Sequence, residues 1–287
     1  MRESTQDIAF SSASALLVLL VVAAAAGFVA LLVMPGLLDR LRALPDNRWW
    51  LLYREPQPGS APLALWRIGA AAAAALISLA ATFRMRAIYR RESSPVLPFI
   101  MVFFFALGLE CLRAGAAVLF ATDAPISISI LFTRAIYWGR FAGMLSLLAA
   151  SLYCMELKYR TFSRIAMGVP LVSFAMAAYI PLDRTLFLVQ LTWKLGDEQS
   201  VWFVNLAIGA LTILTATAAA LTRRSPRFVR LAIAIAILVS SRELVSFAVQ
   251  PGPMAAGLIT QAAGALLCLR AFKGGDAKRG VPRRPAG

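Results

Sequence analysis

The sequence contains no histidine, few cysteines and a small share of charged residues. Without histidine the chain has no usual proton shuttle, lacks the commonest metal ligand and cannot use a Ser-His or Cys-His pair for catalysis. Cys111, Cys154 and Cys268 all fall within apolar stretches and show no CxxC spacing. We interpret them as small packing residues, since neither a disulfide framework nor a metal site has this pattern. We therefore expect no metal and no cofactor.

Catalytic and nucleotide-binding motifs are also missing. The chain has no Walker A loop, Rossmann glycine fingerprint, HExxH, GxSxG elbow or paired aspartate cluster for metal-dependent phosphate chemistry. The four lysines lie at expected helix ends or in loops, so none is placed like a retinal-binding lysine. These absences predict that the protein is not an enzyme. A lipid-modifying enzyme with Glu110 or Glu243 as its base is the least supported alternative.

Apolar residues dominate what the sequence does contain. They make up 60% of the chain, charged residues make up 15%, and the mean hydropathy is +0.74. In a soluble domain roughly a quarter of the residues are charged. At about 20 residues per crossing, 287 residues leave room for seven or eight helices and no added soluble domain. We predict an all-α, polytopic transmembrane helix bundle.

Eight apolar stretches mark the predicted helices of a single domain over residues 1–273. They lie near 11–34, 61–83, 98–121, 126–156, 165–180, 201–221, 231–249 and 254–271. The first could instead be a cleaved signal peptide, which would leave seven helices. It is longer than an apolar signal region of about 7–15 residues and follows no net positive charge, so a retained helix is favoured. The apolar patch 186–193 is too short to span, and we expect a helix lying on the membrane surface there.

Lysine and arginine gather in alternate connections of this layout. They are dense at 84–91, 158–164, 223–230 and the tail 274–287. The positive-inside rule then predicts eight crossings with both termini cytoplasmic, and the Gly/Pro-rich basic tail is expected to be disordered. Compact loops without an N-x-S/T sequon suit a bacterial inner membrane. We attribute the net charge of +15 to topology signals beside anionic lipids. The lipid bilayer is thus an expected partner, and nucleic acid is not.

Six charged residues fall inside the predicted helices. They are Glu110, Arg113, Arg134, Arg140, Arg242 and Glu243. A charge at the bilayer centre costs about 3 kcal/mol on insertion scales, so such residues usually face a protein interior or a water-filled cavity. At 1.5 Å per residue, Glu110, Arg242 and Glu243 lie about 20 Å from the cytoplasmic ends of their helices. The sequence therefore predicts one polar layer between the third, fourth and seventh helices.

Four arginines against two glutamates leave an excess of positive charge in this layer. Arginine cannot lose its proton, so the excess must reach water or meet an anion. One interpretation is a pocket that binds or transports a small anionic solute or a lipid headgroup.

The alternative is that the buried charges are structural. Bridges Glu110–Arg134 and Glu243–Arg140 would brace the bundle, with Arg113 reaching the outer interface. The chain would then be a non-transporting sensory or scaffold subunit that meets a membrane-protein partner or a second copy. Both interpretations stay open. Glu110 and Arg113, three residues apart, can also pair directly.

Two local motifs make further predictions. In the turn Asp123-Ala124-Pro125, the Asp123 side chain is expected to cap the following helix, whose first turn tolerates Pro125. Gly139 and Gly143 form a GxxxG pattern, which permits close helix packing. We expect that contact within the chain, since the pattern alone does not indicate a dimer.

Overall fold

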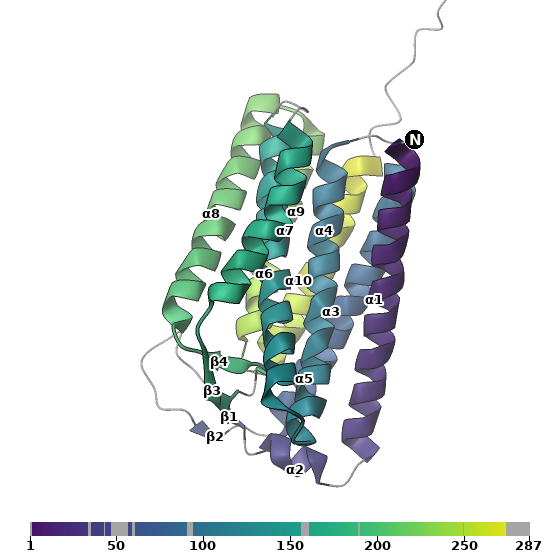
Figure 1. Cartoon of the computed structure of the whole chain (residues 1–287). Helices are drawn as coiled ribbons and strands as arrows, with labels where there is room; N and C mark the ends of the chain where they lie inside the picture. Colours follow the sequence, from purple (N-terminus) through teal and green to yellow (C-terminus); the bar gives the residue numbers. More distant parts are fainter. Residues whose placement is uncertain are drawn as a thin grey trace, which may run out of the picture.

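A computed structural model describes residues 2–33, 36–42, 44–46, 57–58, 61–90, 94–155, 161–188, 190–248 and 250–273. These residues form an all-α bundle of long helices that run side by side (Figure 1). Six of the helical segments are long and apolar enough to cross a membrane. They support a membrane protein with transmembrane helices.

The helices coincide with the predicted apolar stretches. In chain order they are α1 (Arg2–Val33), α3 (Ala61–Tyr89), α4 (Val96–Gly108) continued by η1 (Leu109–Cys111) and α5 (Leu112–Ala121), α6 (Ile126–Cys154), α7 (Phe162–Tyr179), α8 (Glu198–Arg223), α9 (Pro226–Phe247) and α10 (Pro251–Lys273). The described apolar run of α1 is shorter than a full span, and α9 carries four charged residues, so neither counts among the six. The number of crossings and the absence of a soluble domain stay predictions.

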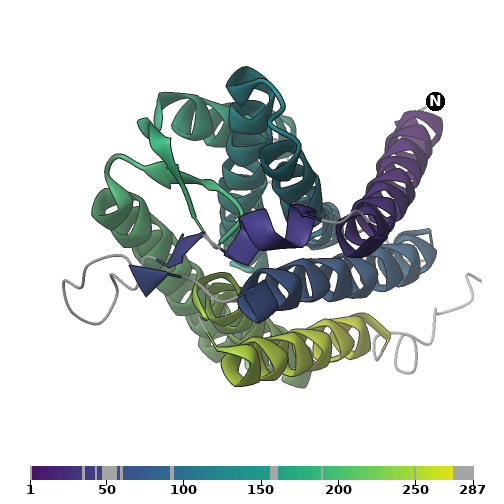
Figure 2. The ribbon, with the colours of Figure 1, turned by 90° about the horizontal axis from the view of Figure 1, so that it is seen from below.

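The central helices are α4–α5, α6 and α9. The apolar window of Val96–Ala121 is 78% buried, whereas that of α7 is only 17% buried. Figure 2 shows α1 and α8 on opposite sides of the bundle. Phe103, Phe104 and Leu238 fill the core between the central helices, and Arg242 is as deeply buried as they are. The six charged residues predicted inside the helices thus lie on the central helices, which water and lipid reach least.

The predicted third helix is interrupted at its middle. A 3₁₀ turn, η1, separates α4 from α5 and contains Glu110. Gly108 precedes the turn, and a Cβ atom there would overlap the Leu17 side chain of α1. The Ser78 hydroxyl of α3 donates a hydrogen bond to the Phe104 carbonyl of α4. Such mid-helix 3₁₀ turns often mark a hinge or local strain, and this one contains the buried Glu110.

The prediction of a surface helix at 186–193 is wrong. Strands β3 (Leu182–Phe187) and β4 (Trp193–Leu195) form an antiparallel hairpin instead. The Phe187 ring stacks on Phe120 of α5 at 4.4 Å between centroids. The Trp193 indole N–H donates to the Ser129 hydroxyl at 2.9 Å. Phe187, Leu188, Leu191 and Trp193 of this patch are therefore buried, which removes the exposed apolar face that a surface helix would give to lipid.

The short element α2 (Leu37–Arg42) lies at the same end of the bundle, together with the two-residue strands β1 (Pro45–Asp46) and β2 (Gln57–Pro58). Asp123 does not cap α6: Pro125 occupies the N-cap position, and α6 has no side-chain cap. Asp123 has a left-handed backbone (φ 52°), and its carboxylate accepts from Arg40 of α2. The residue therefore joins α2 to the α5–α6 turn. The predicted tail 274–287 lies outside the described residues.

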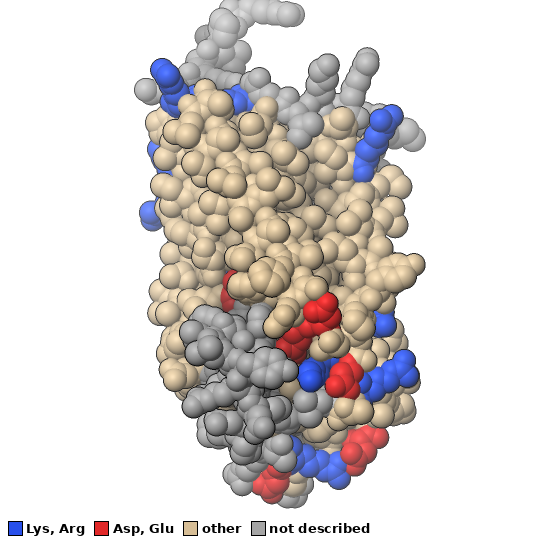
Figure 3. Space-filling view, turned by 90° about the vertical axis from the view of Figure 1, so that its left-hand side faces the viewer, with Lys and Arg blue, Asp and Glu red and all other residues tan. Residues whose placement is uncertain are grey.

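Charged side chains gather toward the two ends of the face drawn in Figure 3, and the band between them is largely uncharged. Exposed apolar side chains of α7 and α8 include Leu171, Phe174, Phe203 and Leu214, each at least 60% exposed. Helix α1 begins and α10 ends at the same end of the bundle (Figure 1). The distribution matches the apolar core and polar boundaries of a bilayer.

Candidate functional site

A small internal cavity lies where α3, the α4–α5 segment, α9 and α10 meet. Its volume of about 20 Å³ suits one water molecule. The polar side chains that line it are Arg67, Glu110, Arg113, Arg242, Ser246 and Gln261. The polar layer was predicted between the third, fourth and seventh helices. The cavity is instead bordered also by α3 and α10, and no residue of α6, the predicted fourth helix, lines it. Of the six charged residues predicted for the site, only Glu110, Arg113 and Arg242 reach it.

Glu110 and Arg113 form a buried ion pair at the cavity wall. Arg113 Nε donates to Glu110 Oε2 at 2.6 Å, and both side chains are less than one-tenth exposed. The direct pairing predicted from their spacing is confirmed. Arg113 does not reach the outer interface as the bracing interpretation expected; its Nη1 donates to the Gln190 carbonyl in the β3–β4 loop. The other carboxylate oxygen, Glu110 Oε1, is buried and has no hydrogen-bond partner among the described residues.

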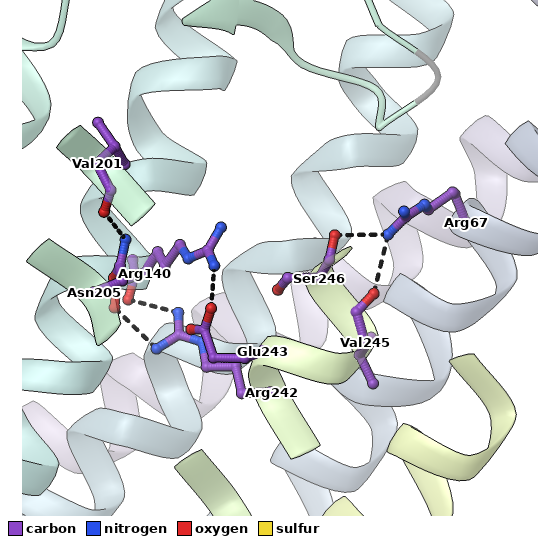
Figure 4. A network of polar contacts seen from close by, with 9 residues as sticks. Arg67, Arg140, Val201, Asn205, Arg242, Glu243, Val245 and Ser246 are labelled. Atoms are coloured by element: carbon purple, nitrogen blue, oxygen red, sulfur yellow. Dashed lines mark hydrogen bonds and ion pairs between the residues drawn. The ribbon is translucent and has the colours of Figure 1, made fainter. Parts of the chain in front are cut away.

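Arg140 and Glu243 form a second ion pair, between α6 and α9 (Figure 4). Arg140 Nη2 donates to Glu243 Oε2 at 2.5 Å. This pairing was predicted and is confirmed. Neither residue lines the cavity. The pair therefore joins two helices beside the cavity without contributing to its wall.

Arg242, next to Glu243 in α9, lies flat against the backbone of α6. Its Nη1 donates to the Arg140 carbonyl at 2.9 Å, and its Nη2 donates to the Gly139 carbonyl at 3.2 Å. The guanidinium also lies 5.8 Å from the Phe103 ring centroid. A Cβ atom at Gly143 would overlap Arg242 Nη1. The GxxxG pattern therefore provides a close contact within the chain, as predicted, and the space it opens holds a guanidinium.

Arg134 lies away from the polar layer, and the predicted Glu110–Arg134 bridge is wrong. Arg134 Nη1 instead donates to the carbonyls of Ala177 and Ala178 in the last turn of α7. The last carbonyls of a helix lack intrahelical partners and carry partial negative charge, which favours a cation. Arg134 and Arg140 are six residues apart and point about 120° away from one another, so they serve different neighbours.

Arg67 is a buried cation that the sequence analysis missed. It is 4% exposed and donates to the carbonyls of Val245, Ser246 and Ala248 at the end of α9 (Figure 4). Arg67 stands six residues after the start of α3. An arginine there is ordinarily a snorkelling interface residue. Its position just inside an apolar run was a weak signal, and the helix end it binds could not be read from the sequence.

Gln261 of α10 was also missed. Its side chain is fully buried at the cavity wall, and neither amide atom has a hydrogen-bond partner among the described residues. Arg242 Nε is similarly buried without a partner there. Nearly all buried polar groups are hydrogen-bonded, to protein or to ordered water. The amide and the guanidinium therefore indicate a polar occupant of the cavity.

The cavity wall carries three guanidinium groups and one carboxylate. Arg113 is neutralised by Glu110, and Arg67 by the carbonyls that end α9. Arg242 donates to carbonyls in the middle of α6 and forms no ion pair with any residue that the structure describes. The uncompensated positive charge is therefore concentrated at Arg242. Within the described residues, no group of His, Cys, Asp and Glu side chains could hold a metal ion.

Comparison with known proteins finds no matching family model, no matching curated protein and no matching solved structure. The function is therefore inferred from the side chains around the cavity and from the placement of charge along the bundle. The helices support the class, a membrane protein with transmembrane helices. The cavity is the feature that a specific function must explain.

Proposed function

We propose that the chain is a multi-pass protein of the bacterial inner membrane that binds a small anion in its central cavity. Eight crossings with both termini cytoplasmic agree with the basic residues at one set of helix ends. The bilayer is the partner of the exposed apolar faces of α7 and α8. Catalysis has little support, because Arg113 and Arg140 already engage the carboxylates of Glu110 and Glu243.

The buried polar atoms at the cavity that lack partners among the described residues include two acceptors, Glu110 Oε1 and Gln261 Oε1, and two donors; the donors carry the proposal. Arg242 Nε and the Gln261 amide nitrogen are buried and lack acceptors among the described residues. The Arg242 charge cannot be removed by deprotonation. An anion in the cavity would accept both N–H groups and offset this charge. Charge-assisted hydrogen bonds of this kind are roughly twice as strong as neutral ones.

The size of the cavity narrows the class of anion. A volume of about 20 Å³ admits an occupant about as large as one water molecule. A monatomic anion such as chloride fits this space. A carboxylate, a phosphate or a lipid headgroup would first require the helices to separate, for example at the 3₁₀ turn that holds Glu110. Transport of the anion would likewise require the cavity to open toward both ends of the bundle.

A second candidate is a non-transporting sensory or scaffold subunit. It is favoured because cations inside the bundle are bound by groups of the chain itself. Glu243 binds Arg140, and the last turn of α7 binds Arg134. In this case the charges brace the bundle, the cavity holds a water molecule, and a membrane-protein partner or a second copy meets the exposed helix faces.

Thermal unfolding in two salts separates the candidates. The purified full chain is heated in neutral detergent in sodium chloride or in sodium gluconate of equal ionic strength. If chloride is present at about thirty times its Kd, binding stabilises the folded protein by about 2 kcal/mol. The midpoint temperature should then be several degrees higher in chloride. Equal midpoints in the two salts would reject the anion site and favour the bracing role.

Variants of neighbouring α10 residues control for general salt effects. Gln261→Leu removes the amide donor from the cavity without changing the charge, so the difference between chloride and gluconate should shrink. Thr260→Val is the matched control, because Thr260 is exposed and its hydroxyl bonds within α10. It should keep the full difference. If the difference in midpoint temperature between chloride and gluconate is the same in both variants, chloride acts elsewhere on the protein.

A further inference from the structure

Four arginines lie in or beside the turn between α8 and α9, and they fall into two pairs. The Arg223 guanidinium lies 5.1 Å from the Phe228 ring centroid, and that of Arg227 lies 4.9 Å from Phe272 of α10. These two cations pack on aromatic faces, where the ring quadrupole attracts them. The other pair, Arg224 and Arg230, is exposed. Both belong to the wall of an open hollow of about 800 Å³, and none of the residues of this wall lines the central cavity.

The hollow combines positive charge with apolar surface. Besides Arg224 and Arg230, its wall contains Ser225, Leu221 and Val229. Leu221 is 71% exposed and Val229 is 45% exposed. Ser225 is the N-cap residue of α9, yet its hydroxyl makes no capping hydrogen bond. Two guanidinium groups and a hydroxyl thus adjoin apolar side chains that nothing described in the chain covers.

Arg224 adopts a backbone conformation that arginine rarely takes. It ends α8 with φ 46° and ψ 28°, in the left-handed region. The left-handed residue that closes a helix is usually glycine. A non-glycine residue held in such a conformation is a reason to look for a function. The conformation places a cationic side chain at the rim of the hollow where glycine would leave none.

We propose that this hollow binds the phosphate group of an anionic phospholipid. Arginine recognises phosphate through paired N–H donors, so Arg224 and Arg230 suit this ligand. Helix α8 is long and apolar enough to cross the membrane, and the hollow lies at its end, where headgroups are found. Leu221 and Val229 would contact the apolar part of the lipid, a contact that free phosphate cannot use. The site does not depend on anion binding in the central cavity.

The test measures lipid binding to the full chain in neutral detergent after delipidation. Phosphatidylglycerol, phosphatidylcholine and inorganic phosphate are titrated, and bound lipid is counted by native mass spectrometry. Wild type should bind phosphatidylglycerol at least about tenfold more tightly than the other two, which corresponds to about 1.4 kcal/mol. Phosphatidylcholine carries the same phosphate beside a choline cation, so its equal binding would overturn the assignment to an anionic phospholipid. Equal binding of inorganic phosphate would make this a site for soluble phosphate and overturn the lipid assignment.

Paired variants distinguish a site from diffuse surface charge. Arg224→Gly/Arg230→Gln should weaken phosphatidylglycerol binding about tenfold, and glycine suits the left-handed backbone, so folding is preserved. Arg164→Gln/Arg270→Gln removes the same number of charges from exposed residues near the corresponding ends of α7 and α10. This control should keep binding within about twofold of wild type. Equal losses in the two double variants, with unchanged thermal midpoints, would overturn the proposal.

Discussion

Arg140 of α6 and Glu243 of α9 meet at 2.5 Å in the interior of the bundle, with side-chain exposures of 5% and 24%. The neighbouring Arg242 bonds to the carbonyl of the same Arg140. Two consecutive residues of α9 thus bind one residue of α6. Glu243 pairs with the Arg140 side chain, and Arg242 donates to the Arg140 carbonyl. The register between the two central helices is set at this point, beside the proposed anion cavity.

The Arg140–Glu243 pair should act as a unit in folding. Arg140→Met leaves the Glu243 carboxylate without its partner, and we expect a loss of about 3–5 kcal/mol in the free energy of unfolding. The double variant Arg140→Met/Glu243→Met should recover part of that loss, because it leaves no unpaired charge. Unfolding in a titration of denaturing detergent measures both. If the loss in the double variant equals the sum of the losses in Arg140→Met and Glu243→Met, the two side chains are not coupled.

Gly143 should be intolerant of any side chain. Gly143→Ala places a methyl group against Arg242 Nη1, and overpacking of this kind costs about 1–3 kcal/mol. Gly168 of α7 is the control, because a Cβ atom there would meet nothing within 4 Å. Gly168→Ala should be neutral or slightly stabilising, since alanine favours helix. Thermal midpoints of the two variants check the prediction, and equal shifts would contradict the packing of Arg242 on α6.

The helices could be predicted because long apolar stretches identify membrane helices almost independently of their neighbours. The β3–β4 hairpin could not. Its apolar side chains read equally well as a surface helix until Trp193 is seen to bond to Ser129 of α6. Asp123 shows the same limit. The local sequence predicts that Asp123 caps α6, but its carboxylate binds Arg40, which is 83 residues away in sequence.

For the site, a pairing near in sequence was easier to predict than the helix ends that bind the other cations. The spacing of Glu110 and Arg113 indicated their contact, and charge alone suggested that Arg140 would meet Glu243. Arg134 was assigned to the wrong partner because a helix end can compensate a cation as a carboxylate does. The sequence does not show that the Gln261 amide is buried at the cavity rather than on an exposed face of its helix. Which helices surround it depends on tertiary packing.

Arg67 should stabilise the end of α9. Replacing it with methionine removes the donors to Val245, Ser246 and Ala248, so these carbonyls lose their Arg67 hydrogen bonds. Each unsatisfied buried group costs about 1–3 kcal/mol. We therefore expect Arg67→Met to lower the thermal midpoint and to speed amide hydrogen exchange over the last turn of α9. Unchanged exchange in that turn would show that α9 ends without help from Arg67.

The β3–β4 hairpin and the start of α8 should weaken in acid. Hydrogen bonds from the Thr185 hydroxyl and backbone N–H lower the pKa of Asp183 below its ordinary value, and hydrogen bonds from the Ser200 hydroxyl and backbone N–H lower the pKa of Asp197. A carboxyl group whose pKa is lowered by folding stabilises the folded state above its unfolded-state pKa of about 3.9. That contribution is lost as the pH falls from this value through the lower folded-state pKa.

Thr185→Val removes the hydroxyl donor and should raise the pKa of Asp183 toward its ordinary value, while that of Asp197 stays low. Carboxyl ¹³C chemical shifts followed through an acid titration measure the two groups separately. A low Asp183 pKa in the variant would mean that the backbone N–H of residue 185 alone holds the carboxylate. The hydroxyl would then contribute nothing to the hairpin's acid sensitivity.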